Sequence, residues 1–351
     1  MSGTSLDGVD LALCAIDGRH YQVIDAATVD YTPEWRQRLA TVENASAREY
    51  ALANAELGHL YGRMVKEFLA GRECDAVASH GHTVFHQPER GLTAQIGDGD
   101  AIAAECGLPV VSNFRTLDVA LGGQGAPLVP IGDELFFGRY DACLNLGGIA
   151  NISYRDGKRV AFDICPCNMA LNRLASELGL PFDRNGDNAR RGLADYYLGQ
   201  TLATLPYYRR PAPKSLGKEW FLDSFWPMVE ASGLPAVDKL RTVTEHIATQ
   251  IAVVLNEHRI GSVLVTGGGA HNGYLIELLK SMAEHTEVVV PDQLTVDYKE
   301  AIVFALLGYL RLKGEINTMC SVTGACVDSI GGTVSGRLDF GKKSKSGPRF
   351  A

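Results

Sequence analysis

The sequence lacks a long apolar run, an excess of basic residues and a regular spacing of cysteines. No apolar run approaches the roughly 20 residues that a helix needs to span a bilayer. The formal net charge is −8, which argues against nucleic acid or an anionic membrane surface as partner. The first residues are Ser, Gly, Thr and Asp rather than basic and then apolar, so we expect no signal peptide.

The eight cysteines are scattered in apolar or helical contexts, as at Cys14, Cys106 and Cys143. This pattern indicates reduced thiols in a cytoplasm rather than a disulfide framework. Hydrophobic residues make up 46% and charged residues 21% of the chain, as is ordinary for a globular enzyme. A length of 351 residues predicts two domains.

The first third of the chain alternates strands and helices. Residues 9–16 and 21–31 are predicted strands joined by a hairpin turn at Asp17-Gly18. Residues 46–70 have apolar side chains at helical spacing, with Ser46 and Glu49 as a capping box and Gly71 as the helix end. Shorter predicted elements are a strand at 76–79, a helix at 99–106 and a strand at 109–112.

The middle of the chain repeats the opening pattern of strand, glycine turn, strand, Asp-Gly turn and strand. The copy begins with a strand at 142–146 and a turn at 147–151, and it ends with a strand at 160–163. A further strand at 262–265 runs into a third glycine turn at 266–269. Helices are expected at 272–284 and 299–312. Strands that alternate with helices predict an α/β fold, and two related sheets with glycine turns predict two lobes that hold a nucleotide between them.

The first ten residues, MSGTSLDGVD, are the most informative of these turns. Gly3 lets backbone amides approach a phosphate, and the hydroxyls of Thr4 and Ser5 add donors. Asp7 and Asp10 are oxygen ligands of the kind that Mg²⁺ prefers. Taken alone, the segment is more typical of an ordinary glycine-rich turn, but the recurrence of such turns downstream favours phosphate binding.

Together the motifs resemble the anhydro-N-acetylmuramic acid kinases of the sugar kinase/Hsp70/actin superfamily. The matching segments are MSGTSLDGVD at 1–10, HGHTV at 80–84, QIGD at 95–98, NFR at 113–115 with Asp118, GGQGAPLVP at 122–130, NLGGIAN at 145–151, TGGGA at 266–270 with Asn272, EAIVFA at 300–305 and VTGA at 322–325. The resemblance implies the two-lobed, ribonuclease H-like α/β fold of that superfamily, with duplicated mixed sheets and an interlobe cleft. We expect an N-terminal lobe at 1–130, a C-terminal lobe at 131–341 and a disordered basic tail at 342–351.

The resemblance also implies a reaction. ATP would phosphorylate O6 of 1,6-anhydro-N-acetylmuramic acid while water opens the anhydro bridge, a step of peptidoglycan recycling and amino-sugar catabolism. ATP and Mg²⁺ are the implied cofactors, Asp7 and Asp10 the metal ligands, and a cytoplasmic homodimer without nucleic-acid or membrane partners the implied state. The residues that the motifs assign to nucleotide binding are Gly3, Thr4, Ser5, Leu6, Asp7, Gly8, Val9, Asp10, Asn145, Gly147, Gly148, Asn151, Gly267, Gly268 and Gly269; those assigned to the sugar are Thr83, His82, Arg115 and Glu300.

Arg115 and Glu300 each have a purely structural alternative. For Arg115 the less favoured alternative is a surface salt bridge. Glu300 could complement the dipole at the N-terminus of a helix. His80 and His82 are expected to be hydrogen-bonded residues of the substrate cleft. Gly122–Gly125 is expected to be a flexible element.

One segment departs from the family pattern. The family's Asp-Thr-Gly-Pro-Gly-Asn segment, with a catalytic aspartate four residues beyond the Asn, reads here as residues 163–172 with Asn172 at the base position. An amide cannot accept a proton at neutral pH. Asp183 or Asp187 could supply the base, with Asp7 a further catalytic carboxylate in the first loop. The alternatives are a kinase of another amino sugar with a free hydroxyl, or a catalytically weak relative.

A metal-dependent hydrolase with His80, His82 and His86 as ligands is a less favoured alternative, since 83–85 is predicted to be extended. Cys165 and Cys167 are expected to be small residues beside a helix start, although that helix N-terminus would favour a reactive thiolate at Cys167. Relatives have a leading strand before the first turn, so we expect the true N-terminus to lie upstream of Met1.

Overall fold

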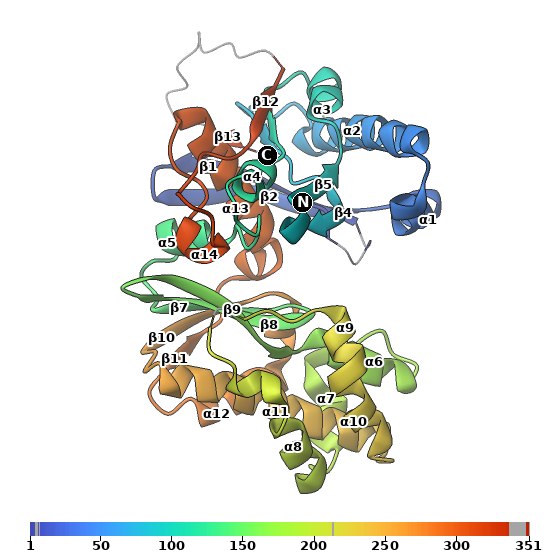
Figure 1. Ribbon diagram of the computed structural model, residues 1–351, viewed down its shortest axis with the longest axis vertical. Helices are drawn as coiled ribbons and strands as arrows, with labels where there is room; N and C mark the ends of the chain where they lie inside the picture. Colours follow the sequence, from blue (N-terminus) through green and yellow to red (C-terminus); the bar gives the residue numbers. More distant parts are fainter. Residues whose placement is uncertain (4–5, 7, 213, 337–348, 351) are drawn as a thin grey trace. The chain divides into compact units, whose positions relative to one another are not determined.

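The computed structural model describes residues 1–3, 6, 8–212, 214–336 and 349–350. Its contacts divide the chain into unit 1, Met1–Phe136 with Tyr298–Ala351, and unit 2, Phe137–Asp297. Both units combine strands and helices, and the α/β fold class with mixed sheets is confirmed (Figure 1). None of the described helices is both long and apolar enough to cross a membrane.

Unit 1 contains three small groups of strands in the order β13-β1-β2, β12-β6-β3 and β4-β5. Its strands are β1 (Gly8–Asp17), β2 (His20–Asp30), β3 (Val77–Ala78), β4 (His82–Gln87), β5 (Leu92–Ile96), β6 (Val110–Ser112), β12 (Thr333–Ser335) and β13 (Arg349–Phe350). Its helices are α1 (Pro33–Thr41), α2 (Ala47–Leu69), α3 (Gly99–Cys106), α4 (Thr116–Ala120), α5 (Pro130–Leu135) and α14 (Cys320–Thr323).

The predicted hairpin and the predicted long helix of unit 1 are confirmed. β1 pairs antiparallel with β2 from Gly8 opposite Asp30 to Asp17 opposite His20. α2 begins after Ser46, whose side chain accepts from the Glu49 amide while the Glu49 carboxylate accepts from the Ser46 amide. The helix end differs by one residue from the prediction, because Ala70 takes the left-handed conformation with φ 47° and caps α2.

Helix α2 lies against α3 at two glycines (Figure 1). A Cβ atom on Gly58 would lie 2.6 Å from the Asp98 carbonyl oxygen, and one on Gly62 would lie 2.5 Å from Glu105 Cβ. The side-chain oxygen of Asn54 on α2 accepts from the Gly97 amide at 2.9 Å. The α2–α3 contact therefore fixes the QIGD segment, residues 95–98, between β5 and α3.

Unit 2 is built on one five-stranded sheet in the order β11-β10-β7-β8-β9, in which β11, β10 and β7 are parallel and β7, β8 and β9 antiparallel. Its strands are β7 (Ala142–Leu146), β8 (Ile149–Asp156), β9 (Lys158–Pro166), β10 (Ser262–Thr266) and β11 (Glu287–Val289). Its helices are α6 (Asn168–Glu177), α7 (Asp187–Arg191), α8 (Tyr196–Ala203), α9 (Lys218–Trp220), α10 (Trp226–Ala231), α11 (Ala236–Glu257) and α12 (Gly273–Met282), and α13 (Gln293–Lys313) runs from unit 2 into unit 1.

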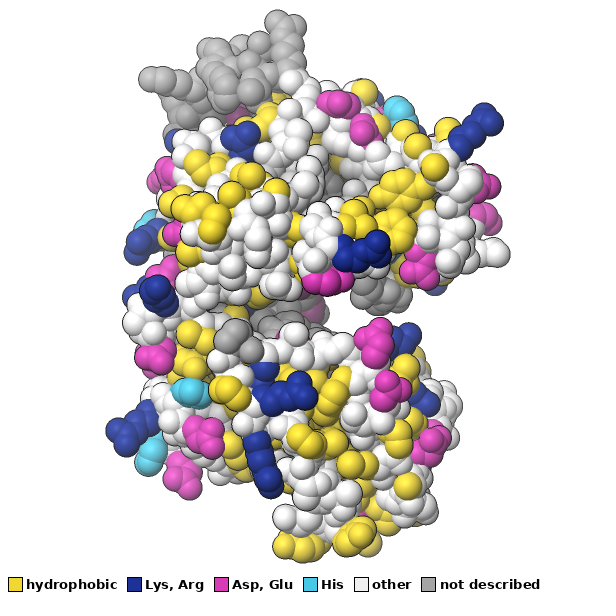
Figure 2. Space-filling view, in the orientation of Figure 1, with side chains coloured by type: hydrophobic (Ala, Val, Ile, Leu, Met, Phe, Trp, Pro, Cys, Tyr) yellow, Lys and Arg dark blue, Asp and Glu magenta, His cyan; other side chains and the backbone are white. Residues whose placement is uncertain are grey.

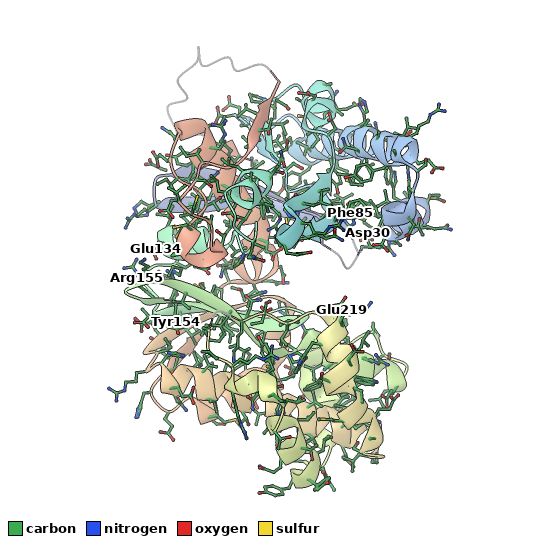
Figure 3. The ribbon with its side chains drawn as sticks, in the orientation of Figure 1. Asp30, Phe85, Glu134, Tyr154, Arg155 and Glu219 are labelled. Atoms are coloured by element: carbon green, nitrogen blue, oxygen red, sulfur yellow. The ribbon has the colours of Figure 1, made fainter. Side chains whose placement is uncertain are left out.

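Strand β8 is buried over Ile152, Ser153 and Tyr154 and becomes exposed at its end. Tyr154 is buried and hydrogen-bonds His258 at 3.2 Å, whereas its neighbour Arg155 is exposed (Figure 3). The strand–turn–strand–turn–strand pattern predicted for residues 142–163 is thus confirmed as β7, β8 and β9 of one sheet. β8 begins at Ile149, inside the segment predicted as a turn.

The expected lobe boundaries, 1–130 and 131–341, are wrong at the C-terminal end. Residues 298–336 pack in unit 1 rather than with the second sheet. The reason is the apolar second half of α13, where Ile302 and Leu306 share a core with Cys14 and Ile16 of β1. The expected disordered tail falls largely outside the described residues, but Arg349–Phe350 forms β13 beside Cys14 and Ala15.

Candidate active site

The first glycine turn closes through backbone pairing of its two ends. Ser2 forms an antiparallel bridge with Val9, and the Asp10 amide donates to the Met1 carbonyl oxygen at 2.8 Å. Leu6 has a φ of 59°, the left-handed region that tight turns require. The predicted tight turn into β1 is therefore confirmed at these residues, while Thr4, Ser5 and Asp7 lie outside the described residues.

Arg115 in unit 1 is held by neutral acceptors. Its Nε and Nη2 atoms lie 3.0 and 2.9 Å from Nε2 of His80, and its Nη1 donates to the Gly125 carbonyl oxygen at 2.6 Å. Loss of water lowers the pKa of Arg115 to about 10, and the nearby Glu300 opposes this shift. Arg115 is thus a half-buried cation at neutral pH, and it forms no ion pair with any described residue. The surface salt-bridge alternative for Arg115 is wrong.

Asp118 joins three of the motifs behind Arg115. Its Oδ2 accepts from the Gly125 amide and its Oδ1 from the Thr323 hydroxyl, each at 2.7 Å, and its side chain is buried. The Gln124 amide also donates to the Thr323 carbonyl oxygen at 2.8 Å. These bonds fasten Gly122–Gly125, the segment expected to be flexible, to the residues around 323. Because Gly125 in turn accepts from Arg115, Asp118 supports the arginine indirectly.

Glu300 lies two turns inside α13, because the helix begins at Gln293 rather than near 299. The helix-dipole alternative for Glu300 is therefore wrong. Its side chain is exposed, yet the pKa of its carboxyl is raised, first because surrounding protein displaces part of its water and also because of the Asp10 charge, against the effect of Arg115. Glu300 is therefore a surface carboxylate of unit 1 within the electrostatic reach of Arg115 and Asp10.

Thr83 and His82 lie at the start of β4, which is extended as predicted. The Gln95 amide nitrogen lies 3.4 Å from the Thr83 hydroxyl. His82 is buried and its Nδ1 lies 3.2 Å from the Ser2 hydroxyl, which also accepts from Tyr31 at 2.7 Å. The bond between His82 and Ser2 connects the segment that was expected to contact the sugar to the first glycine turn.

In unit 2 the second glycine turn is backed by the start of α6. The amides of Cys167 and Asn168 donate to the carbonyl oxygens of Gly148 and Gly147 at 2.9 and 3.1 Å. The Asn168 side chain donates to the Leu146 carbonyl oxygen at 3.0 Å. Within the described residues the Gly147 and Gly148 amides donate no hydrogen bond. Two adjacent free amides at a strand end are suited to an anionic oxygen.

The third glycine turn lies against the second. Asn145 and Asn151 face each other across β7 and β8. A Cβ atom on Gly267, which has a φ of 82°, would lie 2.4 Å from the Asn145 side-chain oxygen, so only glycine fits there. After Gly268 and Gly269 the chain enters α12, which Asn272 caps by accepting from the Leu275 amide at 3.0 Å. The structure thus brings Asn145, Gly147, Asn151 and Gly267 to the same end of the sheet.

Asn172, which was expected at the base position, is exposed on α6 four residues beyond Asn168 and so shares its helix face. Asp183 is buried, and its two oxygens accept from the Asn188 amide, the Asn188 side chain and the Ala189 amide. This arrangement favours a structural role for Asp183 at the start of α7. Asp187 is exposed and accepts from Asn185 at 3.1 Å, which leaves it the more accessible of the two carboxylates.

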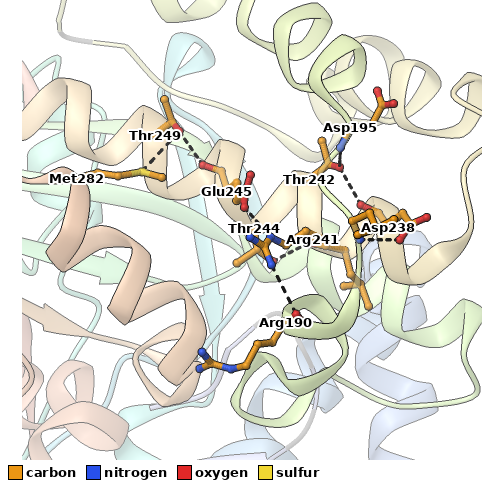
Figure 4. Close-up of polar contacts among 11 residues, drawn as sticks. Arg190, Asp195, Asp238, Arg241, Thr242, Thr244, Glu245, Thr249 and Met282 are labelled. Atoms are coloured by element: carbon orange, nitrogen blue, oxygen red, sulfur yellow. Dashed lines mark hydrogen bonds and ion pairs between the residues drawn. The ribbon is translucent and has the colours of Figure 1, made fainter.

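Helix α7, which begins at Asp187, is anchored to α11 through Arg190 (Figure 4). The Arg190 carbonyl oxygen accepts from Arg241, whose guanidinium also pairs with Glu245 at 2.5 Å. Beyond α7, the Asp195 amide donates to the Thr242 hydroxyl at 2.9 Å. These contacts hold α7 and the residues that follow it on one face of α11.

Cys165 and Cys167 are fully buried beside the start of α6, as expected for small residues that replace glycines. The expected reactivity of Cys167 is wrong, because burial raises the pKa of its thiol to about 12. Burial outweighs the helix N-terminus here, since a thiolate would lose its hydration. All eight cysteines are described, and none forms a disulfide.

The metal-site alternative finds no support in unit 1. His80 is engaged by Arg115, His82 by Ser2 and His86 by Thr93 at 3.1 Å. Among the described residues no three His, Cys, Asp or Glu side chains gather as a metal site would need. His80 is hydrogen-bonded, as expected, but its partner Arg115 was not predicted, and Asp118 was given no role. Both lie inside quoted motifs, but only the tertiary structure reveals what they hold.

Glycine turns at strand ends in both units, together with a cation held by neutral groups, are typical of an ATP-dependent phosphotransferase. The family model for anhydro-N-acetylmuramic acid kinase matches residues 1–336. The chain belongs to the anhydro-N-acetylmuramic acid kinase family.

Individual relatives agree along nearly the whole chain. The anhydro-N-acetylmuramic acid kinase of Gloeobacter violaceus is 40% identical over 362 residues, which cover 93% of this chain and 94% of that protein. That of Aliivibrio fischeri is 36% identical over 348 residues, covering 93% and 95%. A ROK family glucokinase from Streptomyces griseus, solved with glucose and AMPPNP, is 14% identical with a TM-score of 0.38 and covers 85% of this chain and 99% of that chain, a likeness too low to assign a fold.

Proposed function

We propose that this chain transfers the γ-phosphoryl group of ATP to O6 of 1,6-anhydro-N-acetylmuramic acid while water attacks C1 and opens the anhydro bridge. The products are ADP and N-acetylmuramic acid 6-phosphate. The observation that carries the proposal is Arg115, a cation fixed by His80 and Gly125 with no carboxylate partner among the described residues. Such a cation is available to the substrate's lactyl carboxylate or to the transferring phosphoryl group.

The three glycine turns would bind different parts of ATP. The free amides of Gly147 and Gly148 are suited to phosphate oxygens, and Gly267–Gly269 to the adenosine side. The first turn, from Gly3 to Asp10, would contact phosphates from unit 1. Glu300 and Thr83 would contact hydroxyl groups of the sugar. Backbone donors in fixed positions stabilise the charge that spreads over a transferring phosphoryl group without any rearrangement.

Magnesium would enter with ATP, and Asp10 fits it as a ligand. One Asp10 oxygen accepts from the Thr28 hydroxyl at 2.7 Å, and the other has no partner among the described residues. Mg²⁺ usually takes one or two carboxylates and completes its shell with substrate phosphates and water. The metal would neutralise triphosphate charge, and we expect chelation by EDTA to abolish turnover while leaving the fold intact.

The deciding experiment is ATP turnover with 1,6-anhydro-N-acetylmuramic acid in ¹⁸O-labelled water, followed by the mass of the product. A phosphorylated sugar that carries one ¹⁸O atom would support coupled ring opening and phosphoryl transfer. ATP binding without turnover would mean that Asn172 has disabled the ring-opening step. In that case open amino sugars with a free hydroxyl become the substrates to screen, because they need no activated water.

We also propose a homodimer in the cytoplasm. The support for a partner surface is the exposure of Leu193, Tyr196 and Tyr197 at the start of α8, which are 76%, 80% and 81% exposed. Large aromatic side chains at such exposure are common at protein interfaces. The support for the compartment is that eight cysteines form no disulfide.

A further inference from the structure

We propose that His80 is the positioning residue of Arg115 and that it must be the neutral imidazole with its proton on Nδ1. The proposal rests on the proposed function, because the arginine that His80 holds is the one assigned to the anionic group of the substrate. His80 itself would touch neither sugar nor ATP. In this state Nε2 accepts hydrogen bonds and Nδ1 donates one.

The hydrogen bonds around His80 assign its tautomer. Nε2 receives two N–H groups of Arg115, at 3.0 and 2.9 Å, and a guanidinium can only donate. Nε2 must therefore be unprotonated. Nδ1 lies 3.0 Å from the Gly81 carbonyl oxygen, which can only accept. Nδ1 must therefore carry the proton, and both ring nitrogens are satisfied by the neutral form alone.

The surroundings maintain this state. His80 is buried, and its ring meets Phe304 of α13 edge-on with the ring centroids 4.9 Å apart. Burial, followed by the Arg115 charge, lowers the pKa of His80 well below its usual value. Protonation would place a second cation against Arg115 and remove the acceptor of two N–H groups. The neutral imidazole thus holds the guanidinium at Nε and Nη2, and the Gly125 carbonyl oxygen holds it at Nη1 on the other side.

A neutral acceptor leaves the arginine's charge uncompensated, which a carboxylate in the same place would not do. An aspartate or glutamate would fix the guanidinium equally well but would compete with an anionic substrate for it. The choice of His80 therefore fits a cation that must be rigid and still attract an anion. Loss of the His80 contact should therefore lower kcat/KM for a substrate whose anionic group binds Arg115.

Two amide substitutions separate the two hydrogen bonds. In His80→Gln the side-chain oxygen reaches the place of Nε2 and can accept from Arg115. In His80→Asn the shorter amide reaches only the place of Nδ1, so that two arginine N–H groups lose their acceptor. A hydrogen bond to a charged group is strong enough that we expect His80→Asn to lower kcat/KM by about 10-fold to 100-fold. We expect the kcat/KM of His80→Gln to stay within about threefold of the wild-type value.

The same two substitutions in an Arg115→Lys background test whether His80 acts through Arg115. Lysine lacks the planar guanidinium that His80 orients. In the Arg115→Lys background, His80→Asn should therefore lower kcat/KM by less than about a further threefold. His20→Gln, at the exposed start of β2, serves as the matched control and should leave turnover unchanged. Equal losses in His80→Gln and His80→Asn, or losses that multiply in the Arg115→Lys background, would overturn the positioning role.

The tautomer of His80 can be measured without turnover. Nitrogen-15 NMR of the wild-type protein distinguishes a protonated Nδ1 from a protonated Nε2, and the signal lost in His80→Gln identifies His80 among nine histidines. A protonated Nδ1 at neutral pH supports the proposal, and a protonated Nε2 overturns it. Wild-type protein that turns over no sugar would count against the proposed function instead, and the NMR result would still decide the hydrogen bonding of His80.

Discussion

Asn172 is the residue that we expect at the position of the catalytic base. Its side chain is exposed on α6, on the same face as Asn168, which contacts the strand end beside the second glycine turn. An amide there can orient a water molecule but cannot take its proton. Either another carboxylate accepts the proton or the ring-opening step is slow.

We expect Asn172→Asp to raise kcat for the anhydro sugar by about 10²-fold to 10⁴-fold, the usual contribution of a general base. The measurement is initial-rate kinetics with 1,6-anhydro-N-acetylmuramic acid, with ¹⁸O incorporation as the readout of water attack. Ser281→Asp, which adds the same charge on the exposed side of α12, is the control and should change nothing. An unchanged kcat in Asn172→Asp would mean that another group, with Asp187 the accessible candidate, already serves as base.

At the scale of elements, the α2–α3 contact decides the position of the QIGD segment. Replacing a helical glycine by alanine ordinarily stabilises a protein by up to about 1 kcal/mol, because alanine loses less backbone freedom on folding. At Gly58, however, a methyl group would lie 2.6 Å from the Asp98 carbonyl oxygen. The entropic gain and the steric clash oppose each other. The clash should dominate, because it can be relieved only if α2 or α3 moves.

We therefore predict that Gly58→Ala lowers the free energy of unfolding by about 1–3 kcal/mol, the usual cost of overpacking. Gly199→Ala in α8 is the matched variant, since its Cβ would meet nothing closer than 3.9 Å, and it should be stabilising by about 0.5–1 kcal/mol. Urea denaturation of both variants gives the comparison. A stabilised Gly58→Ala protein would show that α3 can shift away from α2 at little cost.

Elements that depend on local sequence were predicted well. The capping box at Ser46, the hairpin at Asp17-Gly18 and the turn at Gly147-Gly148 each follow from residues a few positions apart. The errors involve contacts distant in sequence. The packing of 298–336 in unit 1 depends on partners in β1, and the bond from Arg115 to His80 spans 35 residues. The early start of α13 is different, because it has a local signal that the prediction missed: the Asp292 side chain accepts from the Thr295 amide at 3.0 Å. The periodicity of apolar residues carries no information on contacts between residues distant in sequence. The family motifs nevertheless include His80, Arg115 and residues 300–305 of α13.

At the scale of the whole molecule, the exposed residues at the start of α8 need an explanation. Leu193, Tyr196 and Tyr197 are 76%, 80% and 81% exposed, and Figure 2 shows apolar side chains gathered over α8. Single exposed apolar residues are ordinary, but three large ones within five positions form a local patch. Tyrosine is also among the side chains that contribute most to binding when an interface buries them.

We predict that the wild-type protein is a dimer at micromolar concentration and that the double variant Tyr196→Glu/Tyr197→Glu is a monomer. Burying an aromatic side chain contributes about 1.5–3 kcal/mol, so two buried carboxylates in place of two tyrosines should weaken association by several orders of magnitude. Light scattering coupled to size-exclusion chromatography measures the mass directly. Val327→Glu, at a position 52% exposed in unit 1, is the control and should remain dimeric. A monomeric wild-type protein, or a dimer that survives the double substitution, would remove the α8 patch from consideration as the subunit interface.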